Sequence, residues 1–116
     1  MMNTHLPIRE IAPDVYVAPQ LEPTDMAEVA RLGFAAVINN RPDGEGGPEQ
    51  PLNTAVQAAA AAVGLNYQYL PVEGAYQSPE EIAAFGQLLA QVPRPLLCFC
   101  RSGARSTRLY VAATGA

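Results

Sequence analysis

The chain has 116 residues and a mass of 12.3 kDa, with 49% hydrophobic and 16% charged residues, which suits one globular domain over residues 1–116. Its formal net charge of −4 and pI near 4.8 exclude a broad basic surface for nucleic acid or an anionic membrane. No apolar run is long enough to span a bilayer, and residues 1–10 lack the apolar core of a signal peptide. We therefore expect a cytoplasmic protein that binds neither membranes nor nucleic acid.

Charge is distributed unevenly along the chain. Residues 1–81 contain 3 arginines and all 11 acidic residues, whereas residues 82–116 contain 4 arginines and no acid. Arg101, Arg105 and Arg108 lie within one short segment. This balance predicts local attraction for a small anion on a protein that repels anions elsewhere.

The first third of the chain is expected to form a hairpin, a helix and a strand. Apolar runs at 8–11 and 15–18 flank an Ala-Pro-Asp turn signal. Thr24 can cap a helix that Gly33 ends, and the apolar run 34–39 follows as a buried strand.

The middle of the chain begins with a loop and returns to helix and strand. Residues 40–51 (NRPDGEGGPEQP) are too rich in Pro and Gly for a regular element, and long loops after strands often carry function. An alanine-rich helix is predicted over 52–63, ended by Gly64, and a strand over 66–72.

The last third carries the clearest local signals. Ser78 is followed by Pro79, and Glu81 stands where it completes a capping box, so a helix is predicted from here to about Gln91. Residues 96–99 form a continuous apolar run, typical of a strand covered on both faces. The alternation of strands and helices predicts an α/β domain with a mostly parallel central sheet flanked by helices.

Cys100 directly follows that last strand, in the segment CRSGARST, and Ser106 or Thr107 is expected to begin the final helix. Small residues allow successive backbone N–H groups to surround an anion, and a helix N-terminus adds a positive field. These groups and Arg105 would lower the pKa of a thiol below its free value of about 8.5. The segment predicts a nucleophilic Cys100 with Arg105 as its catalytic partner. The other anion-binding residues of this loop are Arg101, Ser102, Gly103, Ala104 and Ser106.

The second cysteine and the single histidine are expected to stand outside the chemistry. Cys98 lies within the strand and is predicted to pack in the core. It is too close to Cys100 for a useful disulfide, and the two cysteines with His5 fall short of a zinc ligand set. We expect no metal and no cofactor.

Residues 100–106 resemble the active-site loop of rhodanese-like sulfurtransferases. Together with residues 37–45 (VINNRPDGE) and 69–72 (YLPV), they resemble the phosphatase-like domain of beta-lactamase-hydrolase-like proteins, which is related to dual-specificity phosphatases. The resemblance covers nearly the whole chain and implies a three-layer, dual-specificity-phosphatase-like fold, with the Cys loop between the last strand and the following helix. It leaves the chemistry open, because some relatives are described as phosphatases and others are fused to persulfide dioxygenases.

The active-site loop and the end of the chain depart from the pattern of such families. Phe99 stands where tyrosine phosphatases have a His, and four residues instead of five separate Cys100 from Arg105. The shorter loop makes a tighter cradle, which favours a single sulfur atom on the cysteine over a tetrahedral phosphate. The chain also ends at Ala116 where relatives continue, so we expect a short or truncated C-terminal helix and a face that a second copy of the chain could cover.

Three functions follow from these residues. The favoured one is sulfur transfer, in which Cys100 forms a persulfide from thiosulfate or glutathione persulfide, with Arg101 and Arg105 holding the anionic donor and a persulfide dioxygenase as a candidate partner. The second is hydrolysis of a phosphate ester through a phosphocysteine at Cys100. The third is a non-catalytic anion-binding module.

Phosphate-ester hydrolysis needs a general acid, because the leaving alkoxide or phenoxide must be protonated. Asp43 in the long loop and Glu73 after the LPV segment are the candidates. Arg41 either pairs with the acids of its own loop or projects into the site as a second anion contact.

Overall fold

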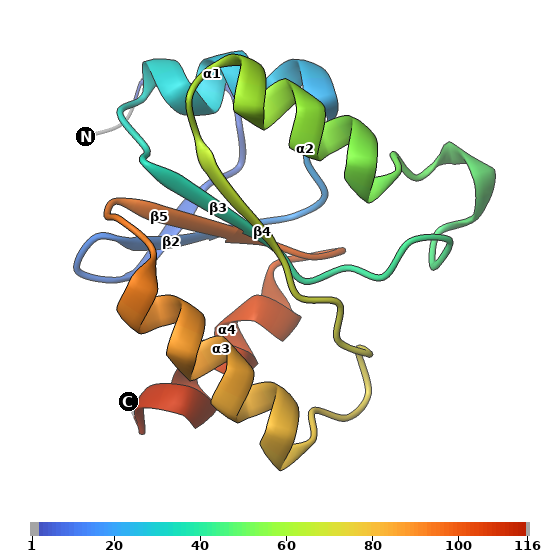
Figure 1. Ribbon diagram of the computed structural model, residues 1–116, viewed down its shortest axis with the longest axis vertical. Helices are drawn as coiled ribbons and strands as arrows, with labels where there is room; N and C mark the ends of the chain where they lie inside the picture. The colour runs from blue at the N-terminus through green and yellow to red at the C-terminus, as the bar shows by residue number, and fades with distance from the viewer. Residues whose placement is uncertain (1–2, 116) are drawn as a thin grey trace.

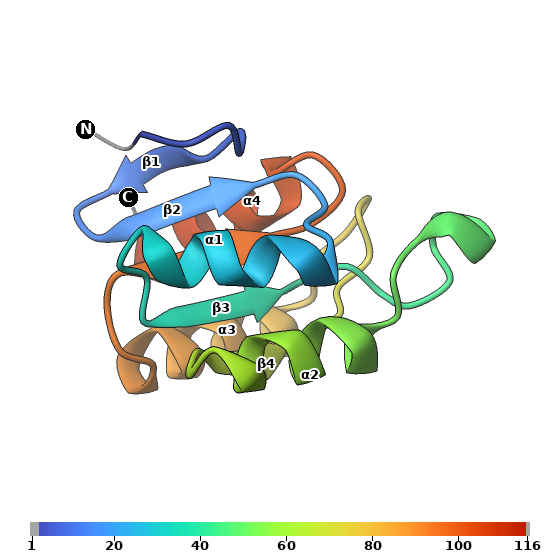
Figure 2. The same ribbon diagram turned by 90° about the horizontal axis from the view of Figure 1, so that it is seen from above.

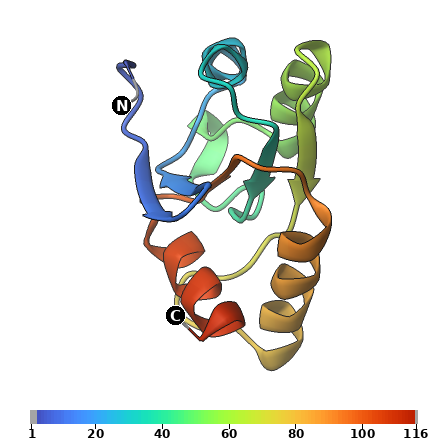
Figure 3. The same cartoon turned by 90° about the vertical axis from the view of Figure 1, so that its left-hand side faces the viewer.

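The computed structural model describes residues 3–115, so Met1 and Met2 of the N-terminal segment, and Ala116 at the end of the chain, lie outside the described residues. A five-stranded sheet lies between two layers of helices (Figures 1 and 3). The strands are β1 (Arg9–Ala12), β2 (Val15–Ala18), β3 (Ala36–Asn39), β4 (Asn66–Tyr69) and β5 (Leu96–Phe99). The helices are η1 (Pro23–Asp25), α1 (Met26–Arg31), η2 (Gly47–Glu49), α2 (Asn53–Ala62), α3 (Pro79–Gln91) and α4 (Ala104–Thr114).

The sheet has the strand order β1-β2-β5-β3-β4, with β1 antiparallel to β2 and every other neighbouring pair parallel. Figure 2 shows the arrows of β2 and β3 pointing one way and that of β1 pointing back. The parallel strands end in register, since Phe99 pairs with both Ala18 and Asn39, and Asn39 pairs with Tyr69. The loops that follow β2, β3, β4 and β5 therefore all start at the carboxyl ends of the strands, on one side of the molecule.

Each face of the sheet has its own hydrophobic core. Leu97 and Phe99 of β5 belong to the core under α1 and α2, whereas Leu96 and Cys98 belong to the core with Phe85 of α3 and Leu109 of α4. The continuous apolar run of β5 is thus covered on both faces, as predicted, and Cys98 is a core residue with 1% exposure. No helix between residues 3 and 115 is long and apolar enough to cross a membrane.

The predicted fold class is confirmed: an α/β, three-layer domain with a mostly parallel sheet and the Cys loop between the last strand and the following helix. Most predicted elements are present with shorter ends, and the strands expected over 34–39 and 66–72 are limited to β3 and β4. The prediction for the helix over 79–91 is confirmed to the residue.

Two predicted helix starts are wrong. Thr24 lies inside the 3-10 turn η1, because the chain already turns two residues earlier, where Glu22 N–H donates to Asp25 Oδ2 at 2.8 Å. The final helix begins at Ala104 and not at Ser106 or Thr107, because Gly103 takes a left-handed conformation (φ 95°) and its carbonyl already accepts from Thr107 N at 3.1 Å. Ser106 therefore lies in the first turn of α4, where its N–H is free of helical bonding.

The start of α3 offers a test of the fold. Ser78 Oγ accepts from Glu81 N at 3.1 Å, and Glu81 Oε1 accepts from Ser78 N at 2.8 Å. Replacing Ser78→Ala should lower the free energy of unfolding by about 1 kcal/mol, because one N–H of the first turn loses its acceptor. Urea unfolding measures the change. Ser78→Thr is the control that keeps the acceptor, and an Ala variant no less stable than the Thr variant would contradict the capping role.

Candidate active site

Cys100 lies at the carboxyl end of β5, at the base of a loop formed by residues 100–103. The residue is 1% exposed, and Gly103 N–H donates to its Sγ at 3.0 Å. This contact requires the left-handed conformation of Gly103, which bends the loop back around the sulfur. The local sequence thus makes the anion-binding turn that its small residues predict.

The two cysteines have opposite acid–base properties. Burial raises the pKa of the Cys100 thiol, but hydrogen bonds from Ser106, Ser102 and Gly103 to the sulfur outweigh burial and lower the pKa below its usual value. Burial is the main cause that raises the pKa of Cys98 to about 12, and the opposing effect of Arg94 is smaller. Cys100 is therefore the more readily ionised thiol and the candidate nucleophile, and Cys98 packs in the core.

Ser106 links the sulfur to the loop after β3. Its backbone N–H is one of the donors that stabilise the Cys100 thiolate. Its hydroxyl also lies near the sulfur, but the single hydroxyl proton is donated to Asn40 Oδ1 at 2.8 Å. Ser106 and Asn40 are both fully buried, so this bond fixes the first turn of α4 against the end of β3.

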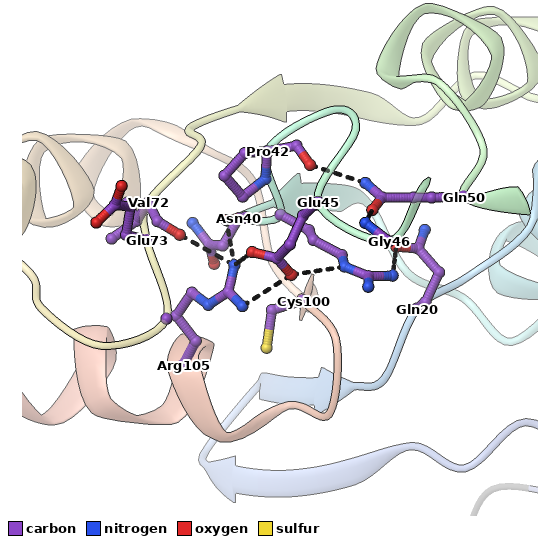
Figure 4. A network of polar contacts seen from close by, with 12 residues as sticks. Gln20, Asn40, Pro42, Glu45, Gly46, Gln50, Val72, Glu73, Cys100 and Arg105 are labelled. Atoms are coloured by element: carbon purple, nitrogen blue, oxygen red, sulfur yellow. Dashed lines mark hydrogen bonds and ion pairs between the residues drawn. The ribbon is translucent and has the colours of Figure 1, made fainter. Parts of the chain in front are cut away.

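Arg105 supplies the positive charge of the site, as predicted, and its side chain is only 8% exposed. Its Nη1 donates to Val72 O at 3.0 Å and, more weakly, to Asn40 O at 3.5 Å (Figure 4). A Cβ on residue 74 would lie 3.1 Å from Arg105 Nη2, so Gly74 leaves room for the guanidinium. Within residues 3–115, Arg105 Nε is the one buried side-chain nitrogen or oxygen without a hydrogen-bond partner.

Glu45 is the site residue that the sequence analysis did not identify. Its Oε1 lies 3.0 Å from Arg105 Nη1, and its Oε2 accepts from Arg105 Nη2 at 3.1 Å and from Arg41 Nε at 2.8 Å. Partial burial raises the pKa of the Glu45 carboxyl, but the hydrogen bonds from Arg105 and Arg41 prevail and hold that pKa below its usual value. One carboxylate therefore bridges two buried guanidinium groups.

The structure shows the first alternative for Arg41, an ion pair with an acid of its own loop. Through Glu45, Arg41 is linked to Arg105, and its use as a second anion contact stays a prediction. Its Nη1 donates to Gln20 Oε1 at 3.1 Å, which ties it to the loop after β2. Glu45 follows Arg41 by four positions, and this is the sequence signal that could have identified the pair.

The two predicted general acids make contacts outside the cradle. Asp43 Oδ1 accepts from Asn53 N at 2.7 Å, so this carboxylate stabilises the start of α2. The Glu73 side chain is exposed and points away from Arg105 in Figure 4. Their role as general acids stays a prediction.

The remaining loop residues surround the cradle. Ser102 Oγ accepts from Ala104 N at 3.3 Å and supports the turn, while the Arg101 side chain is exposed at the loop surface. Residues 3–115 contain no group of three or more His, Cys, Asp or Glu side chains that could hold a metal ion. A separate surface hollow, lined among others by Tyr16, Phe34 and Pro95, lies at the amino ends of the strands and not beside Cys100.

A buried cysteine in an N–H cradle, between the last strand of a mostly parallel sheet and the following helix, is the arrangement of the class of cysteine-dependent, phosphatase-like domains. Comparison with known proteins narrows the class to one family. Residues 7–116 match the family model described as "Beta-lactamase hydrolase-like protein, phosphatase-like domain", and the chain belongs to that family. The resemblance noted in the sequence is thereby confirmed.

Among relatives, the beta-lactamase hydrolase-like protein of Agrobacterium fabrum is 39% identical over 95 residues, which are 82% of this chain and 22% of the relative. The chain thus spans about a fifth of that protein's length. The crystal structure of nma1982 from Neisseria meningitidis, titled a "putative phosphatase", is 31% identical with a TM-score of 0.76, over 83% of this chain and 68% of that one.

A second similar structure supports the fold. A DUF442 protein from Shewanella putrefaciens is 19% identical with a TM-score of 0.77, over 91% of this chain and 66% of that one. Of the two group-transfer hypotheses, the comparisons favour phosphatase-like chemistry over the sulfur transfer that the sequence analysis preferred.

The pKa of Cys100 can be tested by the pH dependence of its alkylation with iodoacetamide. We expect a midpoint below the free value of about 8.5 in the folded protein, and a return to about 8.5 in urea. Because the folded pKa is the lower one, the thiolate's contribution to stability is complete above about 8.5 and is lost as the pH falls through the folded pKa. Mass spectrometry should place the label on Cys100 and not on Cys98, and a folded midpoint at or above the urea value would contradict the role of the N–H donors.

Proposed function

We propose that the chain hydrolyses phosphate monoesters through a phosphocysteine intermediate at Cys100. The observation that carries the proposal is the combination of a stabilised thiolate with a buried Arg105 whose Nε has no partner. An oxygen of a bound phosphate would satisfy that nitrogen, and the N–H groups of the loop would bind the others. The family and the 31% identity to nma1982 support the same chemistry.

The reaction has two steps. The Cys100 thiolate attacks phosphorus and forms a P–S bond, while the P–O ester bond breaks and the leaving alkoxide or phenoxide takes a proton. Water then attacks the phosphocysteine, the P–S bond breaks, and inorganic phosphate and the thiolate are released. Arg105 and the loop N–H groups stabilise the charge on the non-bridging oxygens in both steps.

Proton supply limits which esters react quickly. Asp43 is bonded to the start of α2 and Glu73 points away from Arg105, so esters of acidic phenols should react faster than alkyl esters, whose leaving groups depend on a general acid. Such a preference is expected of a thiolate that the loop N–H groups stabilise and position, without a general acid to assist the leaving group.

Sulfur transfer is a second candidate, favoured by the four-residue spacing between Cys100 and Arg105 and the tight contact of 3.0 Å between Gly103 N and the sulfur. The thiolate would attack the outer sulfur of thiosulfate, the S–S bond would break, and sulfite would leave with its electron pair. The resulting Cys100 persulfide would pass its outer sulfur to a second thiol, with no general acid required. A persulfide dioxygenase is a proposed partner only in this case.

Para-nitrophenyl phosphate tests the first candidate directly. We expect the wild type to release nitrophenol and Cys100→Ser to lose at least about 10³-fold of the rate, because the covalent intermediate cannot form. Cys98→Ala is the matched control and should keep the activity.

Intact-mass spectrometry separates the alternatives. A one-sulfur adduct on the wild type after thiosulfate, absent in Cys100→Ser and without nitrophenol release in the parallel assay, would replace the proposed hydrolase with the sulfurtransferase. Sulfate binding with neither reaction would leave the anion-binding module.

A further inference from the structure

The Glu45 carboxylate binds the guanidinium group of Arg105, which a substrate anion would also bind. Its two carboxylate oxygens lie 3.0 and 3.1 Å from Nη1 and Nη2 of Arg105, in the two-point arrangement that a guanidinium also makes with phosphate (Figure 4). Figure 4 shows this ion pair beside the Cys100 side chain. A tetrahedral oxyanion that contacts Arg105 Nε and Nη2 in the same two-point way competes with the Glu45 carboxylate for Nη2.

The charges of the site make the competition unavoidable. Arg41 and Arg105 carry two positive charges, and Glu45 and the Cys100 thiolate carry two negative ones. A dianion that entered with Glu45 still in place would leave excess negative charge among largely buried groups, which is costly. The carboxylate has to move off Arg105 before a dianion binds.

The surroundings of the pair favour movement of Glu45 and not of Arg41. The Glu45 side chain is 26% exposed and follows Gly44, which has a φ of 83°. The Arg41 side chain is 10% exposed and is held by Gln20 Oε1 at 3.1 Å. A Cβ on Gly46 would lie 2.7 Å from Arg41 Nη2, so the guanidinium is also packed against that backbone.

We propose that Glu45 is a specificity-determining residue, which a dianionic tetrahedral oxyanion displaces from Arg105 and Arg41, so that Arg41 becomes a second anion-binding residue. The inference rests on the proposed use of the cradle as a substrate site, whichever group is transferred. Glu45 raises the binding free energy that an anion must supply, because the anion has to replace the carboxylate on both arginines. A monoanion interacts too weakly with the two arginines to do so. The shared ligand chemistry is that of phosphate and thiosulfate.

Anion titrations by calorimetry test this proposal without any turnover. In a Cys100→Ser background, Glu45→Gln should bind inorganic phosphate and thiosulfate about tenfold more tightly, because the competing charge is gone. Glu49→Gln removes the same charge from the same loop at an exposed position and should change the affinity less than about twofold. Adding Arg41→Gln to Glu45→Gln should reverse most of the gain.

Equal affinities in the Glu45→Gln and Glu49→Gln proteins, or weaker binding after Glu45→Gln, would overturn the proposal. If Glu45→Gln is unstable because Arg105 loses its counter-charge, the shift of the thermal midpoint with sulfate becomes the readout. Sulfate should raise the thermal midpoint of Glu45→Gln by more than that of Glu49→Gln. A thermal midpoint of Glu45→Gln that sulfate does not raise would also overturn the proposal. Because binding is measured without catalysis, a missing phosphatase activity does not affect this result. The anion whose affinity increases more in Glu45→Gln, phosphate or thiosulfate, indicates the charged group of the substrate.

Discussion

The buried guanidinium of Arg105 is the constraint on which the site depends. A charge with 8% side-chain exposure needs hydrogen-bond partners, and those of Arg105 Nη1 and Nη2 come from segments far apart in the sequence: Val72 O, Asn40 O and the Glu45 carboxylate. Its Nε is left for a substrate anion. They meet because the parallel strands β3, β4 and β5 end in register, which places the loops after them at one edge. The sheet positions the loops, and Arg105 fixes how they close over Cys100.

The same arrangement explains how two cysteines on one strand acquire different chemistry. Cys98 points into the core with Phe85 and Leu109, where burial outweighs the attraction of Arg94 and disfavours a thiolate. Cys100 lies one step beyond the strand, where Gly103 turns the chain so that backbone N–H groups surround the sulfur. Both candidate reactions begin there in the same way, with an anion that must take Arg105 from Glu45, and they differ only in the atom that Cys100 attacks and in the need for a leaving-group proton.

The sequence predicted the parts of the fold and site that local patterns encode. The capping box at Ser78, the apolar run of β5 and the small residues around Cys100 each specify a structure within a few positions. The ion pair of Glu45 with Arg105 spans 60 residues and depends on strand order, so no local pattern reveals it. The contact of Asp43 is hidden from the sequence for a related reason. Its carboxylate accepts from the first N–H of α2, ten positions further along the chain, and the residues at the helix start give no sign of this bond.

A crystal structure of Cys100→Ser with inorganic phosphate tests the central claim most directly. We expect phosphate oxygens within hydrogen-bond distance of Arg105 Nε and of the N–H groups of Ser102, Gly103 and Ser106, with the Glu45 carboxylate moved off Arg105. Phosphate bound elsewhere, with the Glu45–Arg105 ion pair intact, would contradict it.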